Sequence, residues 1–202
     1  MRLSLILYVL FFLTNIAYGY LTTSESGDIV PEGQYRITVE PQLNYFGVTT
    51  HFDSGIKEDS QVRLSIGAGQ GGYHFDFNFK QVPFPDYDDQ PAIGYKIGAS
   101  FAKMDGKSVI TPRFYPIVSK SMMIENNRWT PYLSIPIGIS VSQSKSTIPT
   151  HFVVGCEVTP SSLDNIQFGA EMGFNIRDTF SYVSGYISFF FEPTEQISDA
   201  RL

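Results

Sequence analysis

The sequence contains almost no cysteine and, after its first residues, no long apolar run. Cys156 is the single cysteine among 202 residues, so no disulfide can form within the chain. Beyond residue 20 no run approaches the roughly 18 apolar residues that a spanning helix needs, which excludes a helical membrane protein. The fold must therefore be stabilised by a sheet or a packed core rather than by covalent cross-links.

Basic residues and metal-ligand patterns are also scarce. Lysine and arginine number 14 against 20 aspartate and glutamate, and the formal net charge is −6. Nucleic-acid binding depends on clustered basic side chains, so this balance argues against nucleic acid as a partner. Three scattered histidines and one cysteine offer no metal-ligand spacing. We therefore expect no metal and no other cofactor.

Aromatic residues, in contrast, make up 15% of the chain and lie mostly in alternating runs. In residues 166–174, apolar side chains occupy every second position and polar residues or glycine lie between them, and residues 183–191 repeat the pattern. This is the periodicity of β-strands. The large aromatics share one face and small polar residues share the other. A transmembrane β-barrel has this arrangement, with apolar side chains toward lipid and a polar interior.

Similar alternation recurs along the chain from residue 34 to residue 191. It predicts an all-β fold, a closed antiparallel up-and-down transmembrane β-barrel. The number of strands depends on the GAGQGG stretch at residues 67–72, which can be a bulge inside a strand or a turn between two strands. We prefer the bulge, because residues 34–52 and 61–80 then form one long hairpin that changes phase at one height. This gives eight strands, with ten as the alternative.

The chain divides into four parts. Residues 1–19 combine a basic start, a short apolar run and small residues before a cleavage point, which predicts a cleaved secretory signal peptide. Residues 20–32 are polar and predict a flexible lead-in. Residues 33–192 form the predicted barrel, and residues 193–202 form a C-terminal tail.

The last 75 or so residues resemble a known family. The runs TPYLSIPIGISVS, VVGCEVTPSSLDNIQFGAEMGF and YVSGYISFFF are similar to the closing strands of OmpA-like small outer-membrane β-barrels. The resemblance implies eight strands, a bacterial outer-membrane location, contact with outer-membrane lipid and insertion by the barrel-assembly machinery. It also implies that Phe191 acts as the terminal aromatic assembly signal, although the chain continues past it.

Charged residues at alternating positions are expected to face the lumen. They are Arg36, Glu40, Arg63, Asp76, Lys80, Lys96, Arg113, Glu157 and Glu171. A small barrel is only wide enough for its side chains to fill, and buried charges persist when they are paired. We expect these nine residues to pair with one another and close the lumen, and a minor solute channel is the alternative.

A catalytic alternative rests on His51, Asp53 and Ser54, which lie close together near the tip of the first hairpin. Histidine can activate a serine for nucleophilic attack. However, His-x-Asp-Ser in a polar segment is common by chance, so the principal expectation is that no residue is catalytic.

The sequence predicts a small outer-membrane barrel with a structural or surface-interaction role, such as adhesion or envelope integrity. The alternative is a lipid-modifying barrel enzyme. Under the eight-strand arrangement, the hairpin tip at residues 46–69 protrudes from the cell surface and is the expected contact for an external partner.

Overall fold

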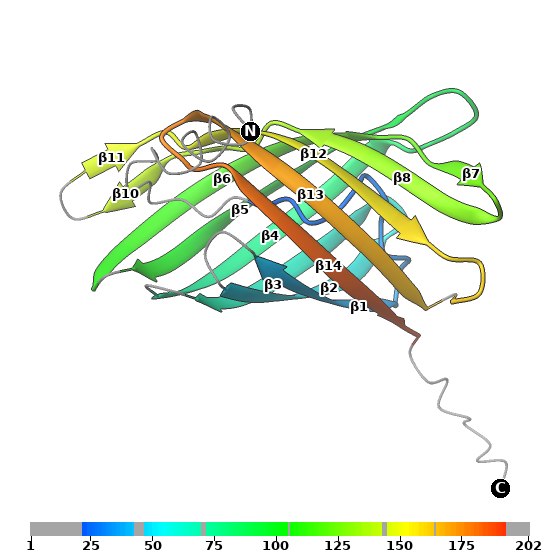
Figure 1. Cartoon of the computed structure of the whole chain (residues 1–202), viewed down its shortest axis with the longest axis horizontal. Helices are drawn as coiled ribbons and strands as arrows, with labels where there is room; N and C mark the ends of the chain where they lie inside the picture. The colour runs from blue at the N-terminus through cyan, green and yellow to red at the C-terminus, as the bar shows by residue number, and fades with distance from the viewer. Residues whose placement is uncertain are drawn as a thin grey trace, which may run out of the picture.

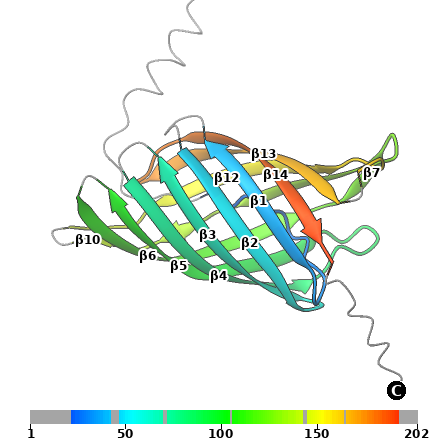
Figure 2. The same cartoon turned by 90° about the horizontal axis from the view of Figure 1, so that it is seen from below.

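A computed structural model shows a closed antiparallel β-barrel of ten strands (Figures 1 and 2). It describes residues 22–42, 47–69, 72–104, 106–142, 145–163 and 165–192. The predicted signal peptide at residues 1–19 and the tail at residues 193–202 lie outside this range. None of the described residues forms a helix that is long and apolar enough to cross a membrane.

The barrel wall is built from neighbours in sequence. Its strands are β1 (Tyr35–Gln42), β2 (Gly47–Lys57), β3 (Ser60–Gly69), β4 (Gly72–Phe84), β5 (Ala92–Met104), β6 (Lys107–Ser119), β8 (Asn127–Ser134), β12 (Thr150–Thr159), β13 (Ile166–Arg177) and β14 (Tyr182–Phe191). Pairing of β1 with β14 joins the first strand to the last, with Tyr35 opposite Phe191. Four short strands complete the sheet: β7 (Met122–Ile124), β9 (Ile137–Gly138), β10 (Ser140–Ser142) and β11 (Lys145–Thr147).

The seventh strand of the wall is interrupted. β8, β9 and β10 follow one another along β6 and all pair with it. Pro136 separates β8 from β9, and Pro112 and Pro116 lie on β6. Because proline has no backbone N–H to donate, this seam has fewer ladder hydrogen bonds than a regular strand pair. Figure 1 shows β7 and the β10–β11 hairpin extending from opposite ends of the wall.

The preferred count of eight strands is wrong, and the alternative of ten is correct. β3 ends at Gly69 and β4 begins at Gly72, with Gly69 paired to Gly72, so the chain reverses direction within the GAGQGG stretch and does not continue as one bulged strand. The first arm of the predicted long hairpin, residues 34–52, is likewise divided into β1 and β2, which pair with each other. Glycine is compatible with both geometries, so the sequence alone did not separate them.

The ten-strand order also relocates the expected partner site at residues 46–69. The β2–β3 turn lies at the end of the barrel where β1 begins and β14 ends, because Tyr35 is paired to both Ser54 and Phe191. β2 and β3 are 11 and 10 residues long, within the range of 8 to 13 residues set by β1 and β4. Within residues 47–69 the turn therefore lies on the same side of the barrel as the start of β1 and the end of β14, and not on the opposite side as predicted.

The barrel wall carries its large apolar side chains on the outside and its polar side chains on the inside, the opposite of the arrangement in a soluble protein. Among the described residues, the exposed large apolar side chains come from every strand of the wall and include Phe52, Phe77, Ile97, Phe114 and Phe174. Most of the buried side chains are polar or charged. The core of this barrel is therefore a polar lumen.

A segment before the first strand fills part of this lumen. Residues 22–31, which we call the lumenal segment, run inside the ring of strands (Figure 1), and residues 23–26 are each at most 1% exposed. This differs from the expected flexible lead-in, since buried wall groups bind the polar backbone of the segment. The segment joins β1 through a turn in which Gln34 N–H donates to Pro31 O at 3.0 Å. A Cβ at Gly55 would overlap the carbonyl oxygens of Val30 and Pro31, so only glycine permits this close approach.

Candidate functional site: the barrel lumen

The most strongly charged part of the lumen surrounds Glu25 of the lumenal segment. Four cations lie within ion-pair distance of its carboxylate: Arg36 at 3.1 Å, Arg63 at 3.4 Å, Lys80 at 3.1 Å and Lys96 at 3.0 Å. Glu25 is fully buried, and each cation is at most 2% exposed. We call these four residues the basic wall. One carboxylate from outside the wall thus joins cations from β1, β3, β4 and β5.

Asp53 of β2 is the second carboxylate that contacts the basic wall. Arg63 donates to it through two nitrogens, at 2.6 and 2.9 Å, and Arg36 donates at 2.9 Å. Such bidentate guanidinium contacts are among the strongest hydrogen bonds in proteins. Asp53 therefore acts as a counter-ion here, and the structure does not place it against His51 as a catalytic partner.

The remaining catalytic candidates also separate. Ser54 is half-buried and occupies the opposite face of β2 from the buried His51 and Asp53. His51 instead contacts Ser65 Oγ through Nδ1 at 2.8 Å and Glu40 Oε2 through Nε2 at 2.9 Å. This Glu–His–Ser chain was not anticipated, because its members come from three strands. All three side chains are at most 4% exposed.

The opposite side of the lumen is lined by tyrosines and two carboxylates. Tyr132 and Tyr182 donate to Glu171 at 2.6 and 2.7 Å, and Tyr186 donates to Glu157 at 3.1 Å. We call these five residues the tyrosine cluster. Glu171 also accepts two backbone N–H groups of the lumenal segment, so this carboxylate is satisfied by four donors without a cation.

Glycines on the paired strands make room for these tyrosines. Gly155 is paired to Tyr132, Gly169 to Tyr186 and Gly173 to Tyr182, and each ring lies over its glycine. A Cβ at any of the three positions would overlap the ring. The inward glycines therefore set where the phenol groups reach the carboxylates.

We expect Gly173→Ala to destabilise the barrel by about 1–3 kcal/mol, the usual cost of overpacking, because the methyl group displaces Tyr182 from Glu171. Gly185→Ala is the matched control, since a Cβ there would lie 3.7 Å from its nearest neighbour, Gly169 O. The free energies of unfolding in detergent, measured by denaturant titration, should differ between the two variants. Equal values would contradict the packing described here.

A third group of charges lies between β4 and β6. Arg113 Nη1 is 3.7 Å from Asp76 Oδ1 and 3.0 Å from the Tyr115 hydroxyl, and His74 Nε2 is 3.6 Å from Asp76 Oδ2. Arg113 and Asp76 are at most 8% exposed. This is the one ion pair found between two of the nine predicted lumen charges within the described part of the chain.

All nine predicted lumen charges are buried, but their contacts differ from the expected mutual pairing. Arg36, Arg63, Lys80 and Lys96 contact Glu25, which sequence reasoning placed in a mobile segment. Glu40 contacts His51, while Glu157 and Glu171 accept hydrogen bonds from tyrosines. Alternation indicates which face a side chain occupies but not the segment that lies across from it.

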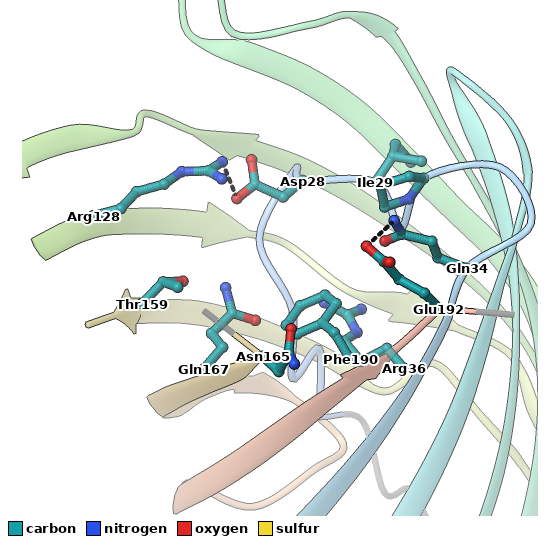
Figure 3. Close-up of a pocket in the computed structure, with 11 residues that line it drawn as sticks. Asp28, Ile29, Gln34, Arg36, Arg128, Thr159, Asn165, Gln167, Phe190 and Glu192 are labelled. Carbon is teal, nitrogen blue, oxygen red and sulfur yellow. Dashed lines mark hydrogen bonds and ion pairs between the residues drawn. The ribbon is translucent and has the colours of Figure 1, made fainter. Parts of the chain in front are cut away.

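A cavity of about 370 Å³ opens at the end of the barrel where β1 begins (Figure 3). Asp28 lies on its rim and pairs with Arg128 at 2.5 Å, while Gln34 Nε2 donates to Glu192 at 3.4 Å. Arg36 forms part of the lining, so the cavity leads from the mouth toward the basic wall. Phe191, the predicted terminal aromatic, ends β14 at this mouth and is 48% exposed.

The electrostatics of Glu25 predict how firmly the lumenal segment is held at different pH values. Burial alone would raise the pKa of this carboxyl, but the four cations of the basic wall lower it well below its ordinary value. A group with a depressed pKa stabilises the docked state above its ordinary pKa of about 4.3, and this contribution is lost as the pH falls toward the lower value.

We therefore expect the lumenal segment to stay docked between about pH 8 and pH 5 and to detach only in stronger acid. The test is the fluorescence anisotropy of a dye on a cysteine at Ile29, in a Cys156→Ser background, through a pH titration. A fall in anisotropy between pH 7 and pH 5 would contradict the assigned environment of Glu25.

No group of three or more metal-binding side chains occurs among the described residues. Comparison with known proteins gives no family, since no family model, curated protein or solved structure matches the chain. The function must therefore be argued from the geometry of the barrel itself.

Proposed function

We propose that this protein is a bacterial outer-membrane barrel whose lumen is closed and whose role is structural or surface-interacting. The polarity of the wall carries this proposal. Soluble monomers rarely expose contiguous apolar patches above a few hundred Å², whereas large apolar side chains are exposed on all ten strands here. Lipid is the solvent that stabilises such a surface.

Strand length agrees with this proposal. The strands of the wall have 8 to 13 residues. A strand of about ten residues is about 33 Å long and, tilted by about 40°, spans the apolar band of about 25 Å of an outer-membrane barrel. Closure joins β1 to β14, so the ring of wall strands has no open seam there, as a bilayer requires, and the remaining sheet edges lie on the short strands β7 and β11. The predicted OmpA-like relationship, the export signal and assembly by barrel-assembly machinery remain part of this proposal.

The direct test is the behaviour of the protein in membranes. We expect it to sediment with the outer-membrane fraction, to resist extraction by urea, and to migrate differently on SDS gels before and after boiling. Recovery in the soluble fraction with unchanged mobility would overturn the proposal. In planar bilayers the native protein should give no stable, large conductance steps, because the lumenal segment and side chains fill the lumen.

The Glu40–His51–Ser65 chain favours a lipid-modifying enzyme as the second candidate function. Its hydrogen bonds resemble those that activate a nucleophilic serine. However, Ser65 is 2% exposed and faces the lumen, so an acyl chain in the bilayer would have to cross the wall to reach it. Mass spectra of envelope lipids should therefore be identical for the native protein and Ser65→Ala, and a difference would favour the enzyme.

A further inference from the structure

The lumenal segment is bound along its backbone by both sides of the barrel. The N–H groups of Thr23 and Ser24 donate to the two oxygens of Glu171 at 2.9 and 2.8 Å. Further along, Gly27 N–H donates to Ser119 Oγ at 2.9 Å, and Val30 N–H donates to Gln61 Oε1 at 2.8 Å. These four donors belong to the backbone and not to side chains, but a Cβ at Gly27 would lie 2.7 Å from Ser119 Oγ, so this position favours glycine.

The carbonyl groups of the segment are bound from the basic wall. Thr23 O accepts from Lys96 at 2.9 Å and from Arg63 at 3.2 Å. Lys80 donates to Ser26 O at 2.7 Å and to Asp28 O at 2.6 Å. The N–H groups of the segment therefore donate to side-chain acceptors of the barrel, and its C=O groups accept from cations of the basic wall. Glu25 supplies the carboxylate that lies between these cations.

Lys80 and Lys96 depend on this segment for their hydrogen-bond acceptors, although Lys96 also lies over the Tyr115 ring, 4.5 Å from its centroid. Across the described ranges, every hydrogen-bond acceptor of Lys80 and Lys96 belongs to residues 23–28. Burying an ammonium group without an acceptor costs much free energy. Without the segment, the two lysines of the basic wall would therefore favour binding of another anion. In the structure the anion that they bind is Glu25 of the lumenal segment, 3.1 Å from Lys80 and 3.0 Å from Lys96.

A short exposed turn connects the lumenal segment to β1. Pro31, Glu32 and Gly33 are exposed, and they join the segment to β1 by one turn at the mouth. The cavity beside the segment opens at the same end (Figure 3). A peptide supplied from solution therefore has a route to the position that the segment now occupies.

We propose that the lumen is a peptide-binding site for a short acidic segment, occupied within the chain by residues 22–31 and able to accept an equivalent peptide from outside. Recognition combines backbone hydrogen bonds, a glycine at the position of Gly27 and one carboxylate at the position of Glu25. Because the site lies in the lumen, peptide binding can be measured in detergent, and the result does not depend on the proposed membrane role.

The test uses the full chain with a site-specific protease sequence inserted at Gly33, in the exposed turn. The protein is folded in detergent and then cut, and a fluorescent peptide of residues 20–31 is added. We expect the cut fragment to stay bound and to exchange with one labelled peptide per barrel. A peptide with Glu25→Gln should bind roughly 30-fold more weakly or worse, since the change removes a buried charge partner.

The matched control is a peptide with Asp28→Asn. Asp28 pairs with Arg128 at the mouth, where the two side chains are 23% and 47% exposed, so its loss should weaken binding by no more than about fivefold. Immediate loss of the fragment, or binding of the native peptide no tighter than a reversed-sequence peptide, would overturn the proposal. So would equal effects of the two substitutions.

A second measurement uses the uncut chain and requires no inserted sequence. Glu25→Gln should make residues 22–31 sensitive to proteolysis while the barrel keeps its different mobility before and after boiling. Protection of the segment equal to that of the native chain would show that the carboxylate does not hold it, which also overturns the proposal.

Discussion

Ile97→Arg is expected to reduce the free energy of folding into lipid vesicles by about 2–4 kcal/mol, while Ile93→Arg reduces it by about 0–1 kcal/mol. Both isoleucines lie on the outer face of β5 and both are 44% exposed. They differ in height, since Ile97 is near the middle of the strand and Ile93 is its second residue. A guanidinium group at mid-height enters hydrocarbon, whereas one at the strand end reaches the interface.

This pair of variants separates a lipid-embedded barrel from a soluble one. In water, replacing an exposed isoleucine away from special features usually changes stability by less than about 0.5 kcal/mol, and height on the strand has no effect. Urea titration of folding into vesicles measures both costs under one condition. Two equal and small values would place the wall in water and contradict the proposed membrane location.

Alternation in the sequence was sufficient to predict the closed all-β barrel, because each strand repeats one apolar and one polar face. It was not sufficient to count the strands. The prediction of eight strands depended on aligning residues 34–52 with residues 61–80 as one hairpin. In the structure Phe52 pairs with Leu64 rather than Val62, and the chain reverses direction between Gly69 and Gly72, which pair with each other. A shift of two residues preserves the facing of every side chain, so periodicity cannot detect it.

The lumenal segment illustrates a second limit. Its sequence, TTSESGDIVP, has the polar composition of a loop, and nothing in its periodicity indicates burial. Its partners lie far away in the chain, as in the contact of Thr23 with Glu171. The surplus of basic side chains on β1 to β5 was the available signal, since cations without nearby carboxylates require an anion from elsewhere.

Asp53→Asn is expected to destabilise the barrel by about 3–5 kcal/mol, the usual cost of removing one partner from a buried ion pair. The amide has nearly the same size as the carboxylate, so the loss comes from charge rather than packing. Arg36 and Arg63 would then share Glu25 with two lysines, leaving four buried cations and one carboxylate. Denaturant titration in detergent measures the change directly.

Asp86→Asn is the control, because Asp86 forms a comparable ion pair with Lys120 at 2.6 Å but in a partly exposed loop. Burial slightly opposes ionisation there, while hydrogen bonds from Lys120 and Ser121 lower the Asp86 pKa. An exposed pair of this kind contributes about 0–1 kcal/mol, so this variant should unfold almost as the native protein does. If Asp53 belonged instead to a catalytic group, Asp53→Asn would leave stability unchanged and alter the envelope lipids. A large loss of stability with unchanged lipids is the result that identifies Asp53 as the counter-ion of the basic wall.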